Sequence, residues 1–346
     1  MIALVSAPSN LGLQPPIAGA VPGTAKAPEA LREAGLYEAF HVRGAVDGGV
    51  VLPARYIDDV RRREGTVRNQ DAIIDHARRL AHRLVALRTA GDSPLVLGGD
   101  CSLVIAAGLA TRVTGGGGLV HVDGHTDFRH PGNSASIGAL AGEDLAAAIG
   151  RHIPEVADID GLGPYFDAAA TAHVGCRYDD PHLAEVDQAI ALAVPADQII
   201  LHGASRAAAR VLATAGLDRG FWLQVDVDVL DPAHMPAVDS SHSGGLSPEE
   251  LTIFLEIVAP RAWGASITVF DPDLDPDGTH ARTVSDIVSQ GLVRLGEDAS
   301  DPAADQADAW SVGRRASDQP SLMADSVSSR DKVLVSRRSP GESQES

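Results

Sequence analysis

The sequence contains only two cysteines among its 346 residues, Cys101 and Cys176. Two thiols cannot form the disulfide framework of a small secreted protein, and so few cysteines are typical of a reducing compartment. Basic residues are also scarce, with 28 lysines and arginines against 47 aspartates and glutamates and a net charge of −19. This balance argues against binding to nucleic acids or anionic membranes, because both require clustered positive charge.

Long apolar segments are missing as well. No apolar run approaches the ~20 residues of a membrane-spanning helix. The opening segment Met1–Val5 lacks the basic and apolar regions of a signal peptide. We therefore expect a cytoplasmic protein that does not contact membranes. With 44% hydrophobic residues, the chain can bury a substantial core.

Short apolar runs alternate with segments of helical periodicity along most of the chain. This alternation predicts an α/β protein whose mostly parallel sheet is covered by helices on both faces. Ser247–Glu250 has the pattern of a capping box at the start of a helix. We expect strands at Ile2–Val5, Leu95–Leu97, Leu119–Val122, His173–Cys176, Ile199–Leu201, Phe221–Val229 and Ser266–Phe270, and helices at Asn69–Arg88, Gly138–Ile149, Gly203–Ala215 and Ser247–Ala259.

The alternating pattern ends near Gly296. The remaining residues are rich in aspartate, serine and arginine and contain few apolar side chains. Such a composition does not bury enough apolar surface to fold. We therefore predict one domain, residues 1–295, followed by a disordered acidic and polar tail at residues 296–346.

Three of the expected strands end in residues that can bind metal ions. The first continues as Gly98-Gly99-Asp100-Cys101-Ser102, the second as Asp123-Gly124-His125-Thr126-Asp127, and the third contains Asp226-Val227-Asp228. Alternate residues of an extended strand face the same side, so these acidic residues are expected to line one pocket. The carboxyl ends of parallel strands are also where α/β proteins bind ligands.

Converging carboxylates repel one another unless a cation neutralises them, and divalent metals do so while sharing bridging carboxylates. A single Asp-x-His or Asp-x-Asp is most often a surface pair or a strand-end turn. The occurrence of such residues at three strand ends of one chain is far more specific, and it predicts a metal site.

These segments resemble the ureohydrolase superfamily, which includes arginase, agmatinase and formiminoglutamase. Its pattern is Gly-Gly-Asp-His-Ser, Asp-Ala-His-x-Asp and Ser-x-Asp-x-Asp-x-x-Asp-Pro. The resemblance extends to Ala7–Gly12, Pro28–Leu36, Gly175–Arg177 and Pro236–Leu246, and covers roughly residues 1–295. It implies an arginase-like three-layer α/β/α fold and hydrolysis of a non-peptide C–N bond in a linear amidine.

By position, the resemblance implies two metal ions, which are Mn²⁺ in most of the family. The first ion would be held by Cys101, Asp123, Asp127 and Asp226, and the second by Asp123, His125, Asp226 and Asp228. A water between the ions would lose a proton and attack a guanidino, formimino or hydroxyguanidino carbon. Asp127 would hold that water and pass its proton to the leaving amine.

Cys101 departs from the family pattern, because most members have histidine there. A metal ion deprotonates a coordinating thiol. The cluster would then carry one more negative charge than with a neutral imidazole, and Zn²⁺ or Fe²⁺ would gain relative to Mn²⁺. The alternative is a small buried thiol beside a single ion held by Asp123, His125 and Asp228.

The substrate-binding positions depart further. Val269 stands where arginase and agmatinase have an acidic residue that pairs with the guanidinium, and Asp271 is the nearest candidate replacement. The histidine of the Gly-Asn-x-His-Gly segment is absent after Asn133, whereas Asp180 matches a substrate contact of arginase. We therefore expect L-arginine to be a poor substrate, and a neutral amidine, formimino, hydroxyguanidino or amide group to fit better.

Two other functions stay open at this point. The missing acidic and histidine residues would also suit a catalytically silent relative that binds a small ligand or regulates a partner. A zinc deacetylase ranks last. Such enzymes need a His-His pair for acid–base catalysis, and none of the 13 histidines is adjacent to another in the sequence. The resemblance further implies a small-molecule substrate and a homo-oligomer, either a trimer or a hexamer.

Overall fold

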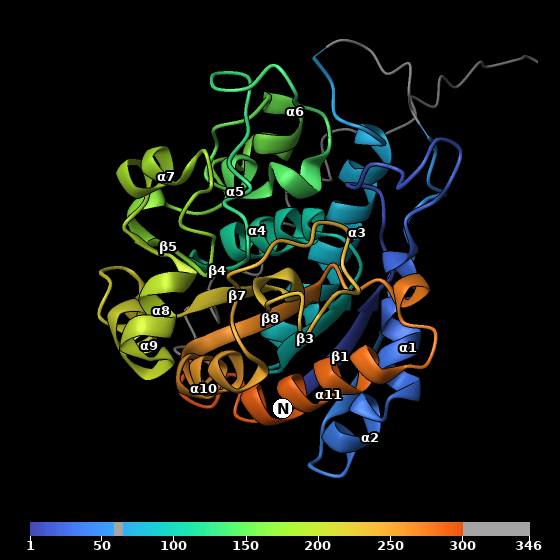
Figure 1. Ribbon diagram of the computed structural model, residues 1–346, viewed down its shortest axis with the longest axis vertical. Coiled ribbons are helices and arrows are strands. Elements are labelled where there is room, and N and C mark those ends of the chain that lie inside the picture. Colours follow the sequence, from blue (N-terminus) through green and yellow to red (C-terminus); the bar gives the residue numbers. More distant parts are fainter. Residues whose placement is uncertain (59–64, 300–346) are drawn as a thin grey trace, which may run out of the picture.

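A computed structural model describes residues 1–58 and 65–299. Within these residues, parallel strands form a single sheet of eight in the order β2-β1-β3-β8-β7-β4-β5-β6 (Figure 1). The strands are β1 (Ile2–Ala7), β2 (Val46–Val50), β3 (Ser93–Gly98), β4 (Gly118–Val122), β5 (Thr171–Val174), β6 (Leu192–Val194), β7 (Phe221–Asp226) and β8 (Ala262–Thr268). Nearly all of the predicted tail lies outside the described residues.

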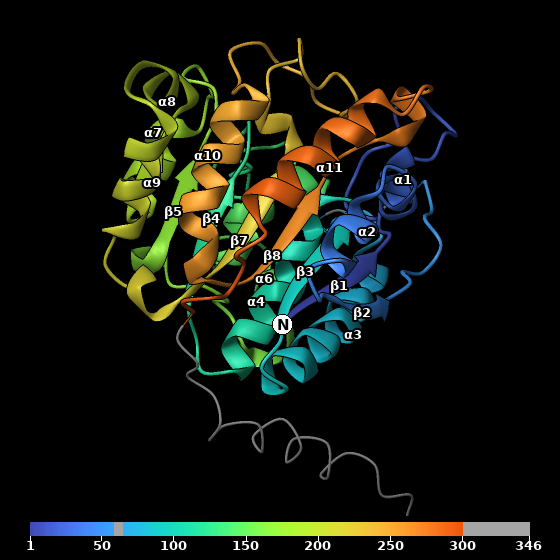
Figure 2. The same cartoon turned by 90° about the horizontal axis from the view of Figure 1, so that it is seen from below.

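Helices cover both faces of this sheet, so the three-layer α/β/α prediction is confirmed (Figures 1 and 2). One face packs against α3 (Gln70–Thr89), α4 (Val104–Val113), α5 (Asp144–Ala148), α6 (Pro154–Ala157) and α7 (Leu183–Ala189). The other packs against α1 (Ala27–Glu33), α2 (Leu36–His41), α8 (Ala196–His202), α9 (Ala204–Leu212), α10 (Pro248–Val258) and α11 (Thr279–Gly291). In the described residues, none of these helices combines the length and apolar character needed to span a membrane.

Local sequence signals account for the best-predicted helices. In α3, the side chains of Ile73, Ala77, Leu80 and Leu84 are buried, as their spacing of three and four residues predicts. At the start of α10, the Ser247 hydroxyl accepts a hydrogen bond from the Glu250 backbone, and the Glu250 carboxylate accepts one from the Ser247 backbone. Both helices begin and end within two residues of the predicted bounds.

The predicted strand Ile199–Leu201 is wrong, because these residues belong to α8. Ile199 is buried while Ile200 and Leu201 are exposed, which fits one apolar position per helical turn. A run of three apolar residues cannot by itself distinguish a strand from a helix. The strand in this region is β6, which was not predicted, and β2 was missed as well.

The predicted helix Gly138–Ile149 is also wrong over its first half. Gly138 has a φ of 128°, and the chain forms only a short 3₁₀ turn at Leu140–Gly142 before α5 begins at Asp144. Gly138 and Gly142 favour turns over helix, and they outweigh the helix preference of the alanines nearby.

Close approach of two chain segments positions the loop after β3. The Asp100 backbone donates to the Ser9 carbonyl at 3.1 Å, and the Ser9 hydroxyl donates to the Asp100 carboxylate at 2.7 Å. A Cβ atom on Gly99 would collide with the Ser9 backbone. Only glycine therefore allows the segment after β1 to pack over the end of β3.

We expect Gly99→Ala to lower the free energy of unfolding by about 3 kcal/mol, the upper end of the usual cost of overpacking. Gly35→Ala is the control, because Gly35 has a φ of 87° but no atom within 4 Å of the position that a Cβ would take. Its cost should be only about 1 kcal/mol, from the left-handed conformation alone. Urea denaturation followed by circular dichroism measures both, and equal costs would show that the contact with Ser9 is not what requires glycine.

Candidate metal centre

Three of four neighbouring strands in the middle of the sheet deliver the predicted metal-binding residues. Strands β3, β8, β7 and β4 lie side by side in that order and run in the same direction. Cys101 opens the 3₁₀ turn after β3, Asp123 follows β4, and Asp226 is the last residue of β7. The parallel order brings their carboxyl ends to one edge although they are far apart in sequence.

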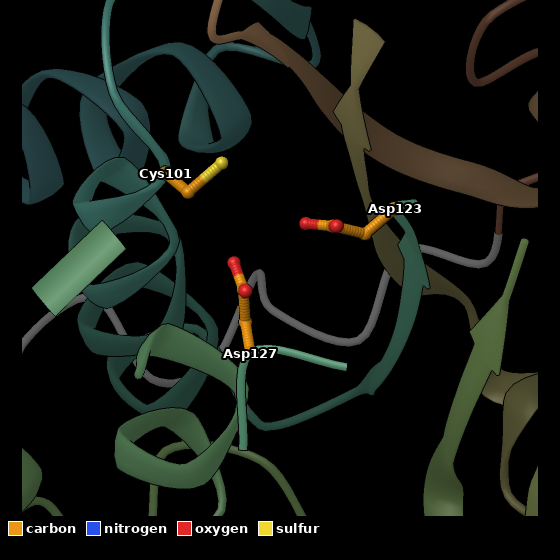
Figure 3. A group of neighbouring side chains, drawn as sticks. All are labelled: Cys101, Asp123 and Asp127. Carbon is orange, nitrogen blue, oxygen red and sulfur yellow. The ribbon is translucent and has the colours of Figure 1, made fainter. Parts of the chain in front are cut away.

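The first group of candidate ligands consists of Cys101, Asp123 and Asp127. One ligand atom of each lies within 4.8 Å of those of the other two. Figure 3 shows the three side chains pointing toward a common space. The Cys101 sulfur donates to Asp226 Oδ2 at 2.7 Å, so Asp226 belongs to the same cluster.

The second group consists of Asp123, His125 and Asp228, again with ligand atoms within 4.8 Å of one another. His125 Nδ1 lies 2.8 Å from Asp228 Oδ2, and His125 Nε2 lies 3.0 Å from His242 Nδ1. Asp123 is common to both groups. The structure therefore brings together all six residues that the sequence predicted as ligands.

The turns that carry these residues differ from the extended strands we expected. β4 ends at Val122, so Asp123, His125 and Asp127 lie in the following loop, where Asp127 has a φ of 46°. β7 ends at Asp226, and Asp228 lies in a 3₁₀ turn. The expectation that strand alternation aligns these side chains is therefore wrong, and convergence arises from the turns instead.

Burial dominates the electrostatics of the cluster. It raises the pKa of Asp123 and of Asp226 well above the ordinary carboxyl range, and repulsion from neighbouring aspartates adds to the effect. Burial likewise raises the pKa of Asp127 and of the Cys101 thiol. Without a compensating cation, the folded protein therefore favours protonated forms of these groups.

The His125–Asp228 pair shows the opposite behaviour. Burial alone would lower the pKa of His125 and raise that of Asp228. Their mutual hydrogen bond and opposite charges outweigh burial, so the pKa of His125 rises to about 9 and that of Asp228 falls. The His125 imidazolium is thus the positive charge that pairs with the Asp228 carboxylate.

Asp123 carries a buried carboxylate oxygen that has no hydrogen-bond partner among the described residues. Asp123 Oδ2 is fully enclosed, and no described residue donates a hydrogen bond to it. Leaving a buried acceptor unsatisfied among like charges is costly, and a bound cation removes that cost. The carboxylate, imidazole and thiol donors therefore fit divalent metal ions.

Three buried residues behind the cluster extend its network. His121 Nδ1 lies 3.0 Å from His173 Nδ1, while His121 Nε2 lies 3.3 Å from Asp144 Oδ1 and 3.8 Å from Asp123 Oδ2. Burial lowers the pKa of His121 to about 3 and raises that of Asp144. Asp144 was not predicted from the sequence, where the acidic pair Glu143-Asp144 within an alanine-rich segment was the available signal.

A cavity of about 660 Å³ opens above the cluster. Asp127, Asp226 and Asp228 form part of its lining, which also includes Asp180 and Asp271, the residues for which the sequence predicts substrate contacts. The Asp180 carboxylate accepts hydrogen bonds from the backbone and hydroxyl of Thr126. The cavity is therefore rich in acidic groups.

Asn133 does not line this cavity, although the sequence places it at the substrate site by resemblance. Its amide nitrogen donates to the Phe128 carbonyl at 2.9 Å and to the Glu185 carboxylate at 2.8 Å. Its oxygen accepts from the His130 backbone. These hydrogen bonds use Asn133 to hold the loop after Asp127 in shape.

Val269 contributes an apolar side chain to the cavity wall. It is buried, and its φ of 71° is unusual for a β-branched residue. Its backbone donates to the Gly99 carbonyl at 2.6 Å. The wall next to β8 therefore offers no carboxylate at this position.

Comparison with known proteins agrees with this architecture. The family model described as the Arginase family matches residues 2–293. Arginase from Brevibacillus brevis is 28% identical over 278 residues, which span 77% of this chain and 91% of the relative. Formimidoylglutamase from Aeromonas hydrophila is 29% identical over 248 residues, which span 65% of this chain and 71% of the relative.

Known structures agree as well. The crystal structure of arginase from Bacillus caldovelox superimposes with a TM-score of 0.75 at 23% identity, covering 84% of this chain and 97% of that one. The similarity in fold therefore extends over the sheet and both helical layers. Together with the match over nearly the whole described chain, it identifies the protein as a member of the Arginase family.

Proposed function

We propose that the protein is a metal-dependent hydrolase that cleaves a non-peptide C–N bond in a linear amidine. The observation that carries this proposal is the pair of ligand groups that share Asp123 beneath an open cavity. Membership of the Arginase family, with relatives named arginase and formimidoylglutamase, supports the same class of reaction.

We assign two divalent ions, with Mn²⁺ as the expected metal, to the two groups. Asp123 and Asp226 would serve both ions, and the thiolate of Cys101 would also admit Zn²⁺ or Fe²⁺ at the first position. The first ion is assigned to Cys101, Asp123, Asp127 and Asp226, and the second to Asp123, His125, Asp226 and Asp228. When bound, such ions would supply a water that ionises near neutral pH.

Asp127 is the residue that we propose for proton transfer. Its carboxylate lines the cavity, and no other described residue donates a hydrogen bond to it. Burial and the nearby Asp144 raise its pKa, which favours a carboxyl group that holds a proton between transfers. An Asp127 oxygen would accept the proton of the attacking water and return it to the leaving amine.

The direct test combines metal analysis with a hydrolysis screen. We expect the purified protein to bind two divalent ions per chain, and Asp123→Asn to lose both because it removes the shared ligand. The exposed Asp197→Asn is the control and should retain both ions. Inductively coupled plasma mass spectrometry counts the ions, and a wild type without stoichiometric metal would favour the silent relative over the enzyme.

In the same screen, at least one guanidino, formimino or hydroxyguanidino compound should be hydrolysed by the metal-loaded protein. Asp127→Asn should reduce kcat by a factor of about 10²–10⁴, the range for loss of a general acid–base group. The rate of ammonia, urea or formamide release measures this effect. An unchanged kcat would exclude Asp127 from proton transfer.

Metal binding should depend on pH in a defined direction. The raised pKa values of Asp123, Asp127, Asp226 and Cys101 mean that the metal-free protein holds protons that a metal must displace. A raised carboxyl pKa stabilises the metal-free fold while the group is protonated, and this stabilisation is lost as pH rises. Fewer protons then remain for the metal to displace. We therefore expect Mn²⁺ to raise the Tm more at pH 8 than at pH 6. Differential scanning fluorimetry tests this, and a smaller gain at pH 8 would contradict it.

Cys101→His tests the assignment of the thiol. The substitution replaces a soft anionic ligand by a neutral imidazole. The ratio of the Zn²⁺ affinity to the Mn²⁺ affinity should therefore fall by about tenfold or more. Competition between the two ions, followed by metal analysis, measures the ratio. If stoichiometry, preference and activity all stay unchanged, Cys101 is not a ligand.

A further inference from the structure

Four cavity carboxylates lie outside the proposed metal ligands, and three of them already have partners. Asp271 accepts hydrogen bonds from the backbones of Gly23 and Asp273 at 3.1 Å and 2.9 Å. Asp273 pairs with Lys26 Nζ at 2.5 Å. Asp180 accepts from the Thr126 hydroxyl and from the His182 backbone. These three carboxylates therefore already bind groups of the cavity walls.

Asp239 is the fourth carboxylate, and it differs from the others. It lines the cavity, is exposed to it, and forms no hydrogen bond or ion pair with another described residue. A carboxylate without a partner is free to bind an incoming group. Asp239→Asn would therefore remove no hydrogen bond or ion pair between described residues.

The segment that carries Asp239 is fixed on both sides. On one side, the Ala237 carbonyl accepts a hydrogen bond from the Asp271 backbone at 2.9 Å. On the other, the His242 carbonyl accepts two hydrogen bonds from the Arg177 guanidinium, which also binds the Asp228 carbonyl at 3.0 Å. This anchoring ties the position of Asp239 to the turn that carries Asp228.

Asp239 lines the same cavity as the proposed metal ligands His125 and Asp228. Protein on its remaining sides raises its pKa to about 7, repulsion from Asp228 adds to this effect, and His125 opposes it. Asp239 therefore shares the cavity with charges that act on its carboxyl group. A cationic ligand would relieve the repulsion and restore the ionised carboxylate.

We propose that Asp239 binds the positively charged amidinium or guanidinium group of the substrate and thereby selects cationic over neutral substrates. Planar N–H pairs of such groups match the two oxygens of a carboxylate. Val269 supplies only apolar surface after β8, so Asp239 would perform the recognition from the neighbouring segment, which is hydrogen-bonded to Asp271 through Ala237. This inference rests on the proposed function for the site, and it revises the expectation that neutral groups fit better.

The test uses the full-length, Mn²⁺-loaded protein and two ligands of the same shape. n-Butylguanidinium carries the charge, and n-butylurea is its neutral counterpart. Isothermal titration calorimetry measures both for wild type, Asp239→Asn and Asp273→Asn. The Asp273 variant removes the same charge from the same cavity but at a carboxylate already paired with Lys26.

We expect Asp239→Asn to weaken n-butylguanidinium binding by about 10- to 100-fold, as for loss of a charged hydrogen bond, with n-butylurea unaffected. Asp273→Asn should change the guanidinium affinity less than about threefold, as for a peripheral charge. The proposal is overturned if wild type does not prefer the cation, if Asp239→Asn keeps that preference, or if both variants lose it equally. Guanidinium binding that depends on Asp239, with no compound of the hydrolysis screen cleaved, would overturn the proposed activity and leave the role of Asp239 standing.

Discussion

Repulsion among buried carboxylates is the constraint on which this structure depends. Asp123, Asp127, Asp226 and Asp228 converge within one cluster, and burial raises the pKa of the first three. The His125 imidazolium pairs with Asp228 and balances part of this charge. A divalent cation would supply the rest, because it satisfies buried anionic oxygens that no hydrogen-bond donor reaches.

The fold concentrates this charge through its strand order. β3 and β4 are consecutive in sequence, yet β8 and β7 lie between them in the sheet, so their carboxyl ends flank a shared space. The glycine at position 99 allows the segment after β1 to pack against this edge. A rigid α/β/α core thus holds residues from four strand ends beneath one cavity, and the loops above it determine which substrate enters.

The sequence predicted those parts that depend on local patterns. The apolar spacing in α3, the capping box of α10 and the motifs at three strand ends all describe neighbours along the chain. By contrast, Ile199–Leu201 was misassigned because a short apolar run fits two structures. The sequence analysis did not recognise Asp144 or Asp239 as site residues. Asp144 is buried beside His121 and Asp239 has no described partner, and both properties result from tertiary packing.

Anomalous diffraction from crystals of the Mn²⁺-loaded protein tests the metal assignment most directly, because it locates the ions without reference to activity. We expect two manganese peaks, one on each side of Asp123, with Cys101 beside the first and His125 beside the second. Peaks elsewhere, or none at the carboxyl ends of β3, β4 and β7, would contradict the assignment.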